Sequence, residues 1–194
     1  MRRPFRHLRG VKSFSLTLAT LVAFATGCKD GKHGAASSPA TSTMAAVTPT
    51  TPYLTNAQPR LQTMKLFLGP EELATELALK PIEIYTGMMW RTNMPEGTAM
   101  LFVFGDATPR SFYMRNTFVP LSLAYIDSEG VIQEMRDLQP LSESSAPSTA
   151  DNIQFVLEVP QGWFKRHNIV PGTVIRTPHG ELLKTFSFGP PPRR

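Results

Sequence analysis

Beyond residue 60 the apolar residues fall into short runs, each closed by glycine, proline or a polar turn. The run 72–79 has helical propensity but also alternates with period two, and we interpret it as a strand beside 63–68. Asp127–Gly130 is a tight hairpin turn between two later runs. The runs predicted as strands are 63–68, 72–79, 99–104, 121–126, 131–138, 155–159, 173–176 and 182–186. Short strands with turns about every 8–12 residues predict a mainly β fold, a compact barrel-like antiparallel sheet.

One or two short helices are predicted beside this sheet. The first begins at Pro81, because a proline at the first helical position lacks only an N–H that would have no partner there. Ile82, Tyr85 and Met89 give this helix one apolar face. Residues 162–167 predict one or two further helical turns.

The first 27 residues predict an export signal. Five basic residues precede an apolar stretch from Phe14 to Ala25, which is shorter than the roughly 20 apolar residues that a membrane-spanning helix needs. The only cysteine, Cys28, follows Ala25-Thr-Gly, and this resembles the lipobox of bacterial lipoproteins, in which the cysteine carries a lipid. Ordinary cleavage after Ala25 is the alternative.

The chain is predicted to divide into four parts. Residues 1–27 are the signal, and residues 28–60, rich in Ala, Ser, Thr, Gly and Pro, form a disordered tether. Residues 61–188 form the barrel-like domain, and residues 189–194 form a disordered tail. We therefore expect an exported protein of the cell envelope, on the periplasmic or cell-surface side. A lipid on Cys28 is expected to anchor it to the membrane. The oligomeric state and the membrane that carries the anchor stay open.

The formal charge of +5 comes from the two ends of the chain. From Cys28 onward there are 15 Lys and Arg and 15 Asp and Glu. Residues 61–186 hold 10 basic and 14 acidic residues, a net charge of −4. Nucleic-acid binding needs a basic patch on the folded domain, so no nucleic-acid partner is expected.

The sequence lacks the residues that several kinds of catalytic and binding site require. With Cys28 used at the terminus, no disulfide, thiol nucleophile or zinc–thiolate site remains. His167 and His179 have no ligand partner at helical spacing, which argues against a metal site. No Walker motif, dinucleotide glycine pattern or Gly-x-Ser-x-Gly elbow occurs. We expect no cofactor, and the chain fits a binding protein better than an enzyme.

Several segments, in order and with sensible spacing, resemble domain-of-unknown-function family 192 of bacteria and archaea. The segments are Leu73–Ala78, Pro81–Arg91, Met100–Phe104, Ser111–Asp127, Val156–Gly162 and Ile169–Val174. The resemblance implies a compact, β-rich, barrel-like fold with a small helix, and it brings no established activity. Where the family usually has Pro-Leu-Asp, this chain has Pro-Leu-Ser ending at Ser122, which removes a carboxylate from that position.

A compact polar cluster, Arg115–Thr117, lies between two predicted strands. In one interpretation it is a turn, because asparagine tolerates left-handed geometry and bonds to local backbone. In the other, Arg115 and Arg91 form a cationic corner for a carboxylate or phosphate, since guanidinium presents a fixed fork of donors. Both arginines follow aromatic residues closely along the chain, which suits a small pocket. The ligand-binding candidates are therefore Arg91, Arg115, Asn116, Thr117, Trp90 and Tyr113.

Three functions follow from these features. The first is a non-catalytic accessory module of the envelope that binds a small anionic or carbohydrate ligand. The second is a hydrolase-like enzyme that uses the loop polar residues Arg115 and Asn116. The third is an envelope scaffold that contacts another protein through an apolar patch.

Overall fold

The computed structural model describes residues 51–186, which form a mainly β domain. Its strands are β1 (Thr63–Leu68), β2 (Glu71–Ala78), β3 (Thr98–Val103), β4 (Ser111–Phe112), β5 (Leu121–Asp127), β6 (Ile132–Leu138), β7 (Ala146–Pro147), β8 (Ile153–Pro160), β9 (Ile175–Thr177) and β10 (Gly180–Glu181). The helices in this part of the chain are α1 (Pro81–Thr86), α2 (Trp163–Arg166) and α3 (Leu182–Thr185).

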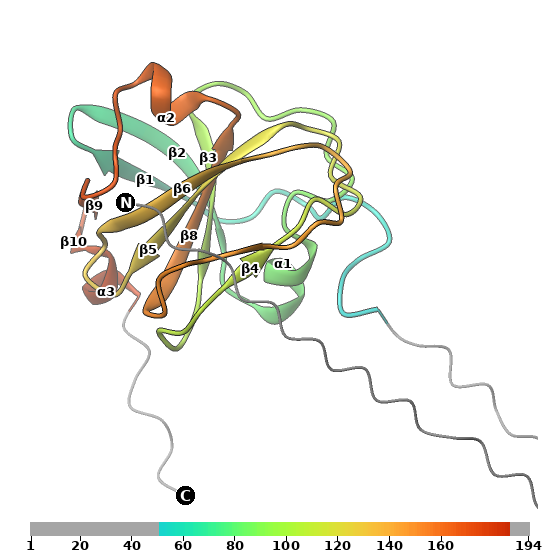
Figure 1. Ribbon diagram of the computed structural model, residues 1–194, viewed down its shortest axis with the longest axis horizontal. Helices are drawn as coiled ribbons and strands as arrows, with labels where there is room; N and C mark the ends of the chain where they lie inside the picture. Colours follow the sequence, from blue (N-terminus) through green and yellow to red (C-terminus); the bar gives the residue numbers. More distant parts are fainter. Residues whose placement is uncertain (1–50, 187–194) are drawn as a thin grey trace, which may run out of the picture. The chain divides into compact units, whose positions relative to one another are not determined.

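One curled sheet contains eight of these strands, in the order β10-β9-β1-β2-β3-β8-β5-β6, and β4 pairs with β7 beside it (Figure 1). Neighbouring strands run antiparallel except β2 and β3, which are parallel and are joined by a crossover through α1. The mainly β, barrel-like sheet predicted from the sequence is therefore confirmed.

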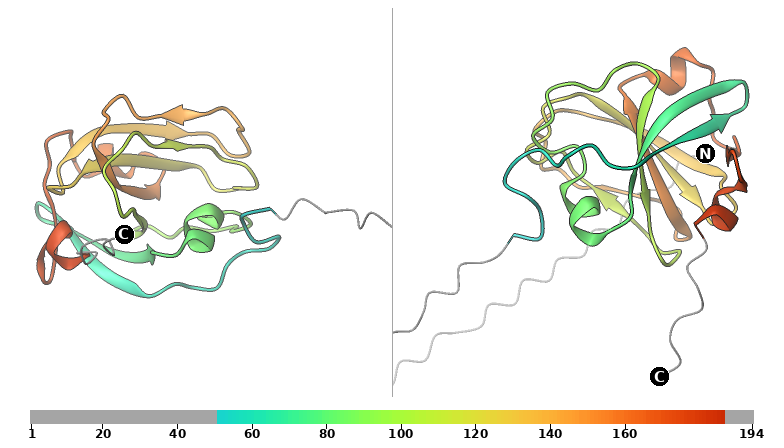
Figure 2. Two further views of the ribbon diagram at one scale, coloured as in Figure 1. Left: turned by 90° about the horizontal axis from the view of Figure 1, so that it is seen from below. Right: turned by 180° about the vertical axis from the view of Figure 1, so that it is seen from behind.

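The curl brings the two ends of the sheet together at one corner. The N–H of Ile132 donates to the carbonyl of Thr173 at 2.9 Å, and the N–H of Ile175 donates to the carbonyl of Gly130 at 2.8 Å. Seen from below, β5 and β6 lie in one layer and β1 and β2 in the other (Figure 2). The sheet is thus a half-barrel in which β9 and its preceding residues meet β6 near Gly130.

The central strands β3, β5 and β8 are buried on both faces. Along β8, Phe155 and Leu157 belong to the core between the two layers. Val156 belongs to a second core on the outer face of the sheet, together with Phe102 and Tyr125. This second core exists because α1, β4, β7 and their loops cover the outer face, and it is here that the cleft described below is found.

Residues 51–60, which the sequence placed in the disordered tether, contact the domain. The N–H of Leu54 donates to Oγ1 of Thr86 at 3.0 Å. The buried amide of Gln58 donates to the carbonyls of Glu83, at 3.2 Å, and Gly87, at 2.8 Å. The Gly87 carbonyl follows the C-terminal end of α1, where a helix leaves acceptors unpaired, and the Glu83 carbonyl also accepts the N–H of Gly87 at 2.9 Å. The signal, Cys28, residues 28–50 and the tail lie outside the described residues.

Two further expectations were wrong in detail. Ile82 and Tyr85 are 40% and 53% exposed, so only Met89 of the expected apolar face is buried. The predicted last strand, 182–186, begins with α3, where the N–H of Phe186 bonds to the carbonyl of Leu182 at 2.9 Å. Leu182 and Phe186 both pack on the core, and residues four apart share a face in a helical turn and in a strand alike, so their spacing did not distinguish the two.

Candidate functional site

A cleft of about 530 Å³ opens on the outer face of the sheet, between α1 and the β4 region. Aromatic and thioether side chains form much of its wall. They include Phe102, Phe104, Phe112, Tyr85, Tyr113 and Met88. A concave, largely apolar site of this size with a few polar groups is the usual form of a small-molecule site.

The aromatic wall is held in place by edge-to-face packing. The rings of Phe102 and Phe112 lie 5.0 Å apart at 81°, and those of Phe112 and Tyr125 lie 6.2 Å apart at 74°. The hydroxyl of Tyr125 donates to the carbonyl of Ala146 in β7. Gly87 has a φ of +47°, and a Cβ there would lie 3.2 Å from the ring of Phe102. The end of α1 therefore approaches the sheet closely enough to form one side of the cleft.

Glu158 is the one carboxylic acid among the cleft-lining residues of 51–186. It lies in β8, directly opposite Met100 of β3 and Leu123 of β5. The residue is 4% exposed, and its Oε2 is buried without a hydrogen-bond partner in the described chain. A buried polar atom without a partner is uncommon in folded proteins. This carboxyl group is the chemically distinctive group of the cleft.

Burial raises the pKa of Glu158 to about 8. A carboxyl group with that pKa is protonated at neutral pH, because desolvation disfavours its charged form. It can then donate a hydrogen bond as well as accept one. The base of the cleft therefore holds a neutral acid that a ligand can pair with or ionise.

A cation lies at the edge of the cleft. The guanidinium of Arg110 stacks over the ring of Phe104 at 3.9 Å and bonds to Asp106 Oδ1 at 2.8 Å. Its Nε donates to the carbonyl of Ile153 at 3.3 Å. The hydrogen bond from Arg110 holds the pKa of the Asp106 carboxyl below its usual value. Arg110 is thus fixed in orientation by the loop that carries it.

The structure gives Arg91 an internal partner. Its Nη1 and Nη2 donate to the two oxygens of Glu76 at 2.6 and 2.8 Å, and both side chains are largely buried. Burial would raise the pKa of Glu76, but the hydrogen bonds from Arg91 and from the N–H of Leu61 outweigh it and leave the pKa lowered. Arg91 does not line the cleft.

The Arg115–Thr117 loop docks on the segment that follows α1. The N–H of Trp90 donates to the carbonyl of Asn116 at 2.7 Å, and Asn116 has the left-handed φ of +55° expected for a turn. Arg115 pairs with Glu143 at 2.8 Å on the surface and lies 5.4 Å from the ring centre of Tyr113. The backbone of this loop therefore lies against Trp90, next to Arg91, although no contact links Arg115 with Arg91.

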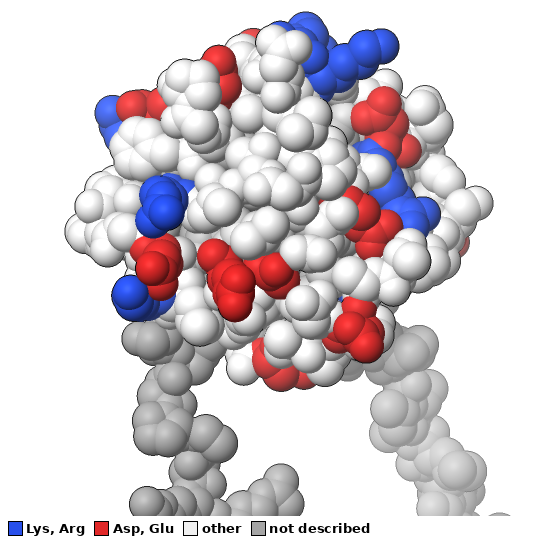
Figure 3. All heavy atoms as spheres, turned by 60° about the vertical axis from the view of Figure 1, so that its left-hand side comes forward, with Lys and Arg blue, Asp and Glu red and all other residues white. Residues whose placement is uncertain are grey.

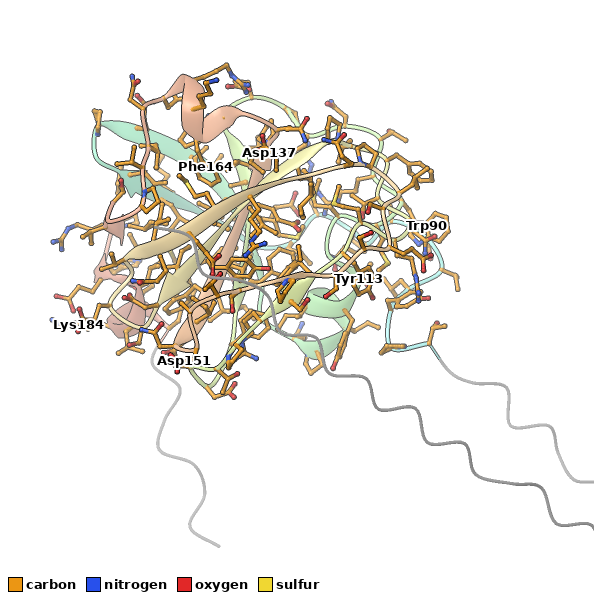
Figure 4. The ribbon with its side chains drawn as sticks, viewed as in Figure 1. Trp90, Tyr113, Asp137, Asp151, Phe164 and Lys184 are labelled. Carbon is orange, nitrogen blue, oxygen red and sulfur yellow. The ribbon has the colours of Figure 1, made fainter. Side chains whose placement is uncertain are left out.

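Only some of the predicted site residues reach the cleft. Tyr113 and Thr117 line it, whereas Trp90 turns to the chain's N-terminal segment and donates its indole N–H to the carbonyl of Leu54 at 3.2 Å. Figure 4 places Trp90 and Tyr113 on the same side of the domain, and Phe164 toward the opposite end, near α2. Of the predicted ligand-binding candidates, Tyr113 and Thr117 thus lie at the cleft, and the prediction did not include Glu158.

A signal for Glu158 was present in the sequence. It is the single charged residue in the run Phe155–Val159, which is otherwise continuously apolar. A charged side chain in a strand buried on both faces either has a partner or shifts its pKa. That signal did not say which face of the sheet the side chain occupies or that a cleft lies above it.

Other polar groups of the domain form surface clusters. His167 stacks on the ring of Trp163, and its ring nitrogens lie 2.9 Å from Glu71 and 3.3 Å from Glu96. No group of three or more His, Cys, Asp or Glu side chains suited to a metal ion occurs within residues 51–186. Within the same residues, every helix is too short or too polar to cross a membrane.

Comparison with known proteins identifies the family but not an activity. The model of the DUF192 family, described as "Uncharacterized ACR", matches residues 65–177. A crystal structure of a proposed transcription regulator from Sinorhizobium meliloti 1021 is similar, with 29% identity, a TM-score of 0.58, and coverage of 62% of this chain and 98% of that one.

A second similar crystal structure is that of a protein of unknown function from Novosphingobium aromaticivorans DSM 12444. It has 26% identity and a TM-score of 0.57, and the match covers 60% of this chain and 86% of that one. No curated protein matches the chain. Because the family model spans more than half of its length, the chain belongs to the uncharacterised DUF192 family.

Proposed function

We propose that this domain is a non-catalytic binding module that holds a small ligand with an apolar body in the cleft. The observation that supports it is the unpartnered carboxyl of Glu158 at the base of an aromatic-lined cavity of about 530 Å³. The aromatic walls offer apolar contact area, and one buried polar group gives orientation and selectivity. The predicted candidates Tyr113 and Thr117 contribute to the walls.

A thermal-shift screen of the full chain against aromatic fragments tests this function. A fragment present at 100 times its Kd stabilises the folded state by about 2.7 kcal/mol, so binding is readily measured. Ser111 and Ser145 share a hydrogen bond of 2.6 Å, but only Ser111 lines the cleft. Ser111→Trp should therefore abolish stabilisation by the fragments, and Ser145→Trp should preserve it. The proposal fails if no fragment stabilises the chain, or if both variants respond alike.

An enzyme is the second candidate, because an acid that is protonated at neutral pH is suited to general acid catalysis. The residue would be Glu158 rather than Arg115 or Asn116, neither of which lines the cleft. Assays with ester and glycoside substrates distinguish the two functions. Turnover that Glu158→Gln abolishes would establish the enzyme, whereas binding without turnover favours the module.

Nucleic-acid binding has little support, although the Sinorhizobium meliloti protein carries a regulator's name. The net charge of residues 61–186 is −4. On the face shown in Figure 3, basic and acidic side chains are interspersed, and no continuous basic surface is present there. A phosphate backbone is held chiefly by such basic surfaces.

We also propose that the protein is exported and anchored at the cell envelope. The signal-like residues 1–27 and the lipobox-like sequence ending at Cys28 support export and lipid anchoring at the cell envelope. Labelled palmitate should be incorporated by the wild type in a bacterial host and not by Cys28→Ser. A wild-type chain that is cleaved and secreted without label would instead establish ordinary signal cleavage after Ala25.

A further inference from the structure

Glu158 is an exception among the inward-facing carboxylates of the described chain. Glu76 is paired with Arg91, and Glu134 accepts hydrogen bonds from the N–H groups of Thr149 and Ala150. Oε2 of Glu158, by contrast, has no partner within residues 51–186. The fold supplies partners for the other acids and leaves this one facing a cavity, which points to a partner from outside the chain.

The walls above this acid are suited to a cation. The face of an aromatic ring attracts a cation electrostatically, and methionine sulfur adds a polarisable contact. The same wall already holds one cation, since the Arg110 guanidinium lies 3.9 Å from the ring centre of Phe104. No second carboxylate lines the cleft in the described residues, so a ligand cation there would pair with Glu158.

A protonated amine satisfies this site better than the other ligand types. An anion could accept a hydrogen bond from the protonated Glu158, but the faces of the aromatic walls carry partial negative charge and disfavour it. A neutral carbonyl would accept the Glu158 proton but would leave the aromatic faces with apolar contact only. An ammonium group has three donors for the two carboxylate oxygens, and it gains from the aromatic faces as well.

We infer that the cleft recognises a protonated amine carried on an apolar body, an inference that rests on the proposed binding function. On binding, the carboxyl of Glu158 releases its proton to solvent, and the ammonium N–H groups donate to the resulting carboxylate. One proton leaves for each cation bound, and no covalent bond other than this O–H changes. The ligand therefore supplies the counter-charge that the chain lacks.

Other charged and titratable groups face this region, and they bear on its pH dependence. They are Arg110 before β4, Tyr85 of α1, Tyr113 after β4, Tyr125 of β5, and Glu134 and Arg136 of β6. Burial raises the pKa of Tyr125, while hydrogen bonds from Thr149 and Arg136 outweigh burial and lower the pKa of Glu134. Neither group changes charge within about one unit of the Glu158 pKa of about 8, the interval in which that carboxyl ionises.

Three probes of one shape test the inference on the full chain by isothermal titration calorimetry. They are benzylamine, benzyl alcohol and benzoate, which are a cation, a neutral molecule and an anion at pH 7. Benzylamine should bind about tenfold or more tightly than either analogue. At pH 6.5, titrations in buffers of different ionisation enthalpy should show release of about one proton per benzylamine bound.

Glu158→Gln is the diagnostic variant, because it keeps the shape and removes the acid. It should lose both the preference for benzylamine and the proton release, whereas Glu129→Gln, at the exposed hairpin tip, should retain them. Proton release in the wild type remains a readout if Glu158→Gln does not fold. Tighter binding of benzyl alcohol or benzoate would overturn the inference and leave the binding function standing. Failure of all three probes in the millimolar range overturns the inference too, and failure of the wider fragment screen overturns the binding function.

Discussion

The carboxylates of this domain differ in whether the chain itself provides a partner. Glu76 receives hydrogen bonds from Arg91 and from the backbone of Leu61, and its pKa is lowered despite its burial. Glu158 receives none at Oε2, and burial raises its pKa to about 8. Two glutamates in one sheet therefore make opposite contributions to stability as the pH changes.

Glu158 is predicted to lower the stability of the folded state as the pH rises. Its folded-state pKa lies above that of an unfolded glutamate, so between about pH 4.5 and 8 the folded state binds the additional proton. Stability relative to Glu158→Gln should fall by about 2 kcal/mol from pH 5 to pH 7. Urea denaturation of both proteins at each pH measures this difference. A difference that does not change with pH would show that Glu158 is ionised in the folded domain.

Arg91→Ala is predicted to destabilise the domain, because it leaves the Glu76 carboxylate largely buried without its ion pair. The cost is about 2–4 kcal/mol at pH 7, and part of it should disappear below the ordinary pKa of glutamate, where Glu76 is protonated. Arg115→Ala is the control, since its pair with Glu143 is exposed and should not change the denaturation midpoint measurably. Similar losses in the two variants would contradict this assignment.

At the scale of elements, the corner where the sheet closes depends on a close backbone approach. Gly130 has a φ of +82°, and a Cβ there would lie 3.0 Å from the carbonyl oxygen of Ile175. The same residue accepts the hydrogen bond from the Ile175 N–H that joins β9 to the β5–β6 hairpin. The turn predicted from Asp127–Gly130 thus also serves a contact between segments far apart in the sequence.

Gly130→Ala should destabilise the domain more than Gly69→Ala. Both glycines have left-handed φ values, but a Cβ at Gly69 would meet nothing within 4 Å. The left-handed conformation costs alanine about 1 kcal/mol at either position, and the contact with Ile175 adds about 1–2 kcal/mol at Gly130. Chemical denaturation of the two variants measures the difference. Equal losses would mean that the closure corner relaxes without strain.

At the scale of the whole domain, one sheet supports two cores. The core between its layers contains Leu101, Leu157 and Trp163, and the outer core contains Phe102 and Tyr125. The outer core is covered by short elements and loops rather than by a second sheet, which leaves room for a cleft. Residues 51–60 stabilise that cover through contacts with the end of α1.

Gln58→Ala tests how much this N-terminal segment contributes. The variant removes the buried amide donor of the Gly87 carbonyl and one of the two donors of the Glu83 carbonyl, which keeps the N–H of Gly87. We expect a loss of about 1–2 kcal/mol and faster hydrogen exchange in α1. Asn56→Ala is the control, because Asn56 is exposed and its amide bonds only to the next residue. An unchanged exchange rate in α1 would show that the segment does not brace the helix.

Local sequence patterns predicted most of the strands, because a strand depends mainly on its own residues and on the turns beside it. The hairpin around Asp127–Gly130 and the buried run 99–104 depend on turn residues and continuous apolar character, and both are present as expected. The segment 182–186 was wrong because its apolar spacing is compatible with either a strand or a helical turn, and packing against the core decided it.

The candidate site was predictable only in part for a related reason. The loop Arg115–Thr117 stood out by composition, yet the arginine that reaches the cleft is Arg110. A carboxylate partner 15 residues distant in sequence, as Glu76 is from Arg91, cannot be assigned from spacing. Whether an arginine is free or paired is a property of the folded chain.

By itself, the sequence determined the class of fold, the family resemblance, the short strands and the chemistries that its composition lacks. These depend on residue types and on periodicity, which are local quantities. The tertiary structure alone decided that β8 turns Glu158 to the outer face, that α1 and β4 leave a cleft above it, and that Arg91 is paired. Curling one sheet on itself brings distant residues together, so the charge within the apolar run of β8 is visible in the sequence but the cleft assembled around it is not.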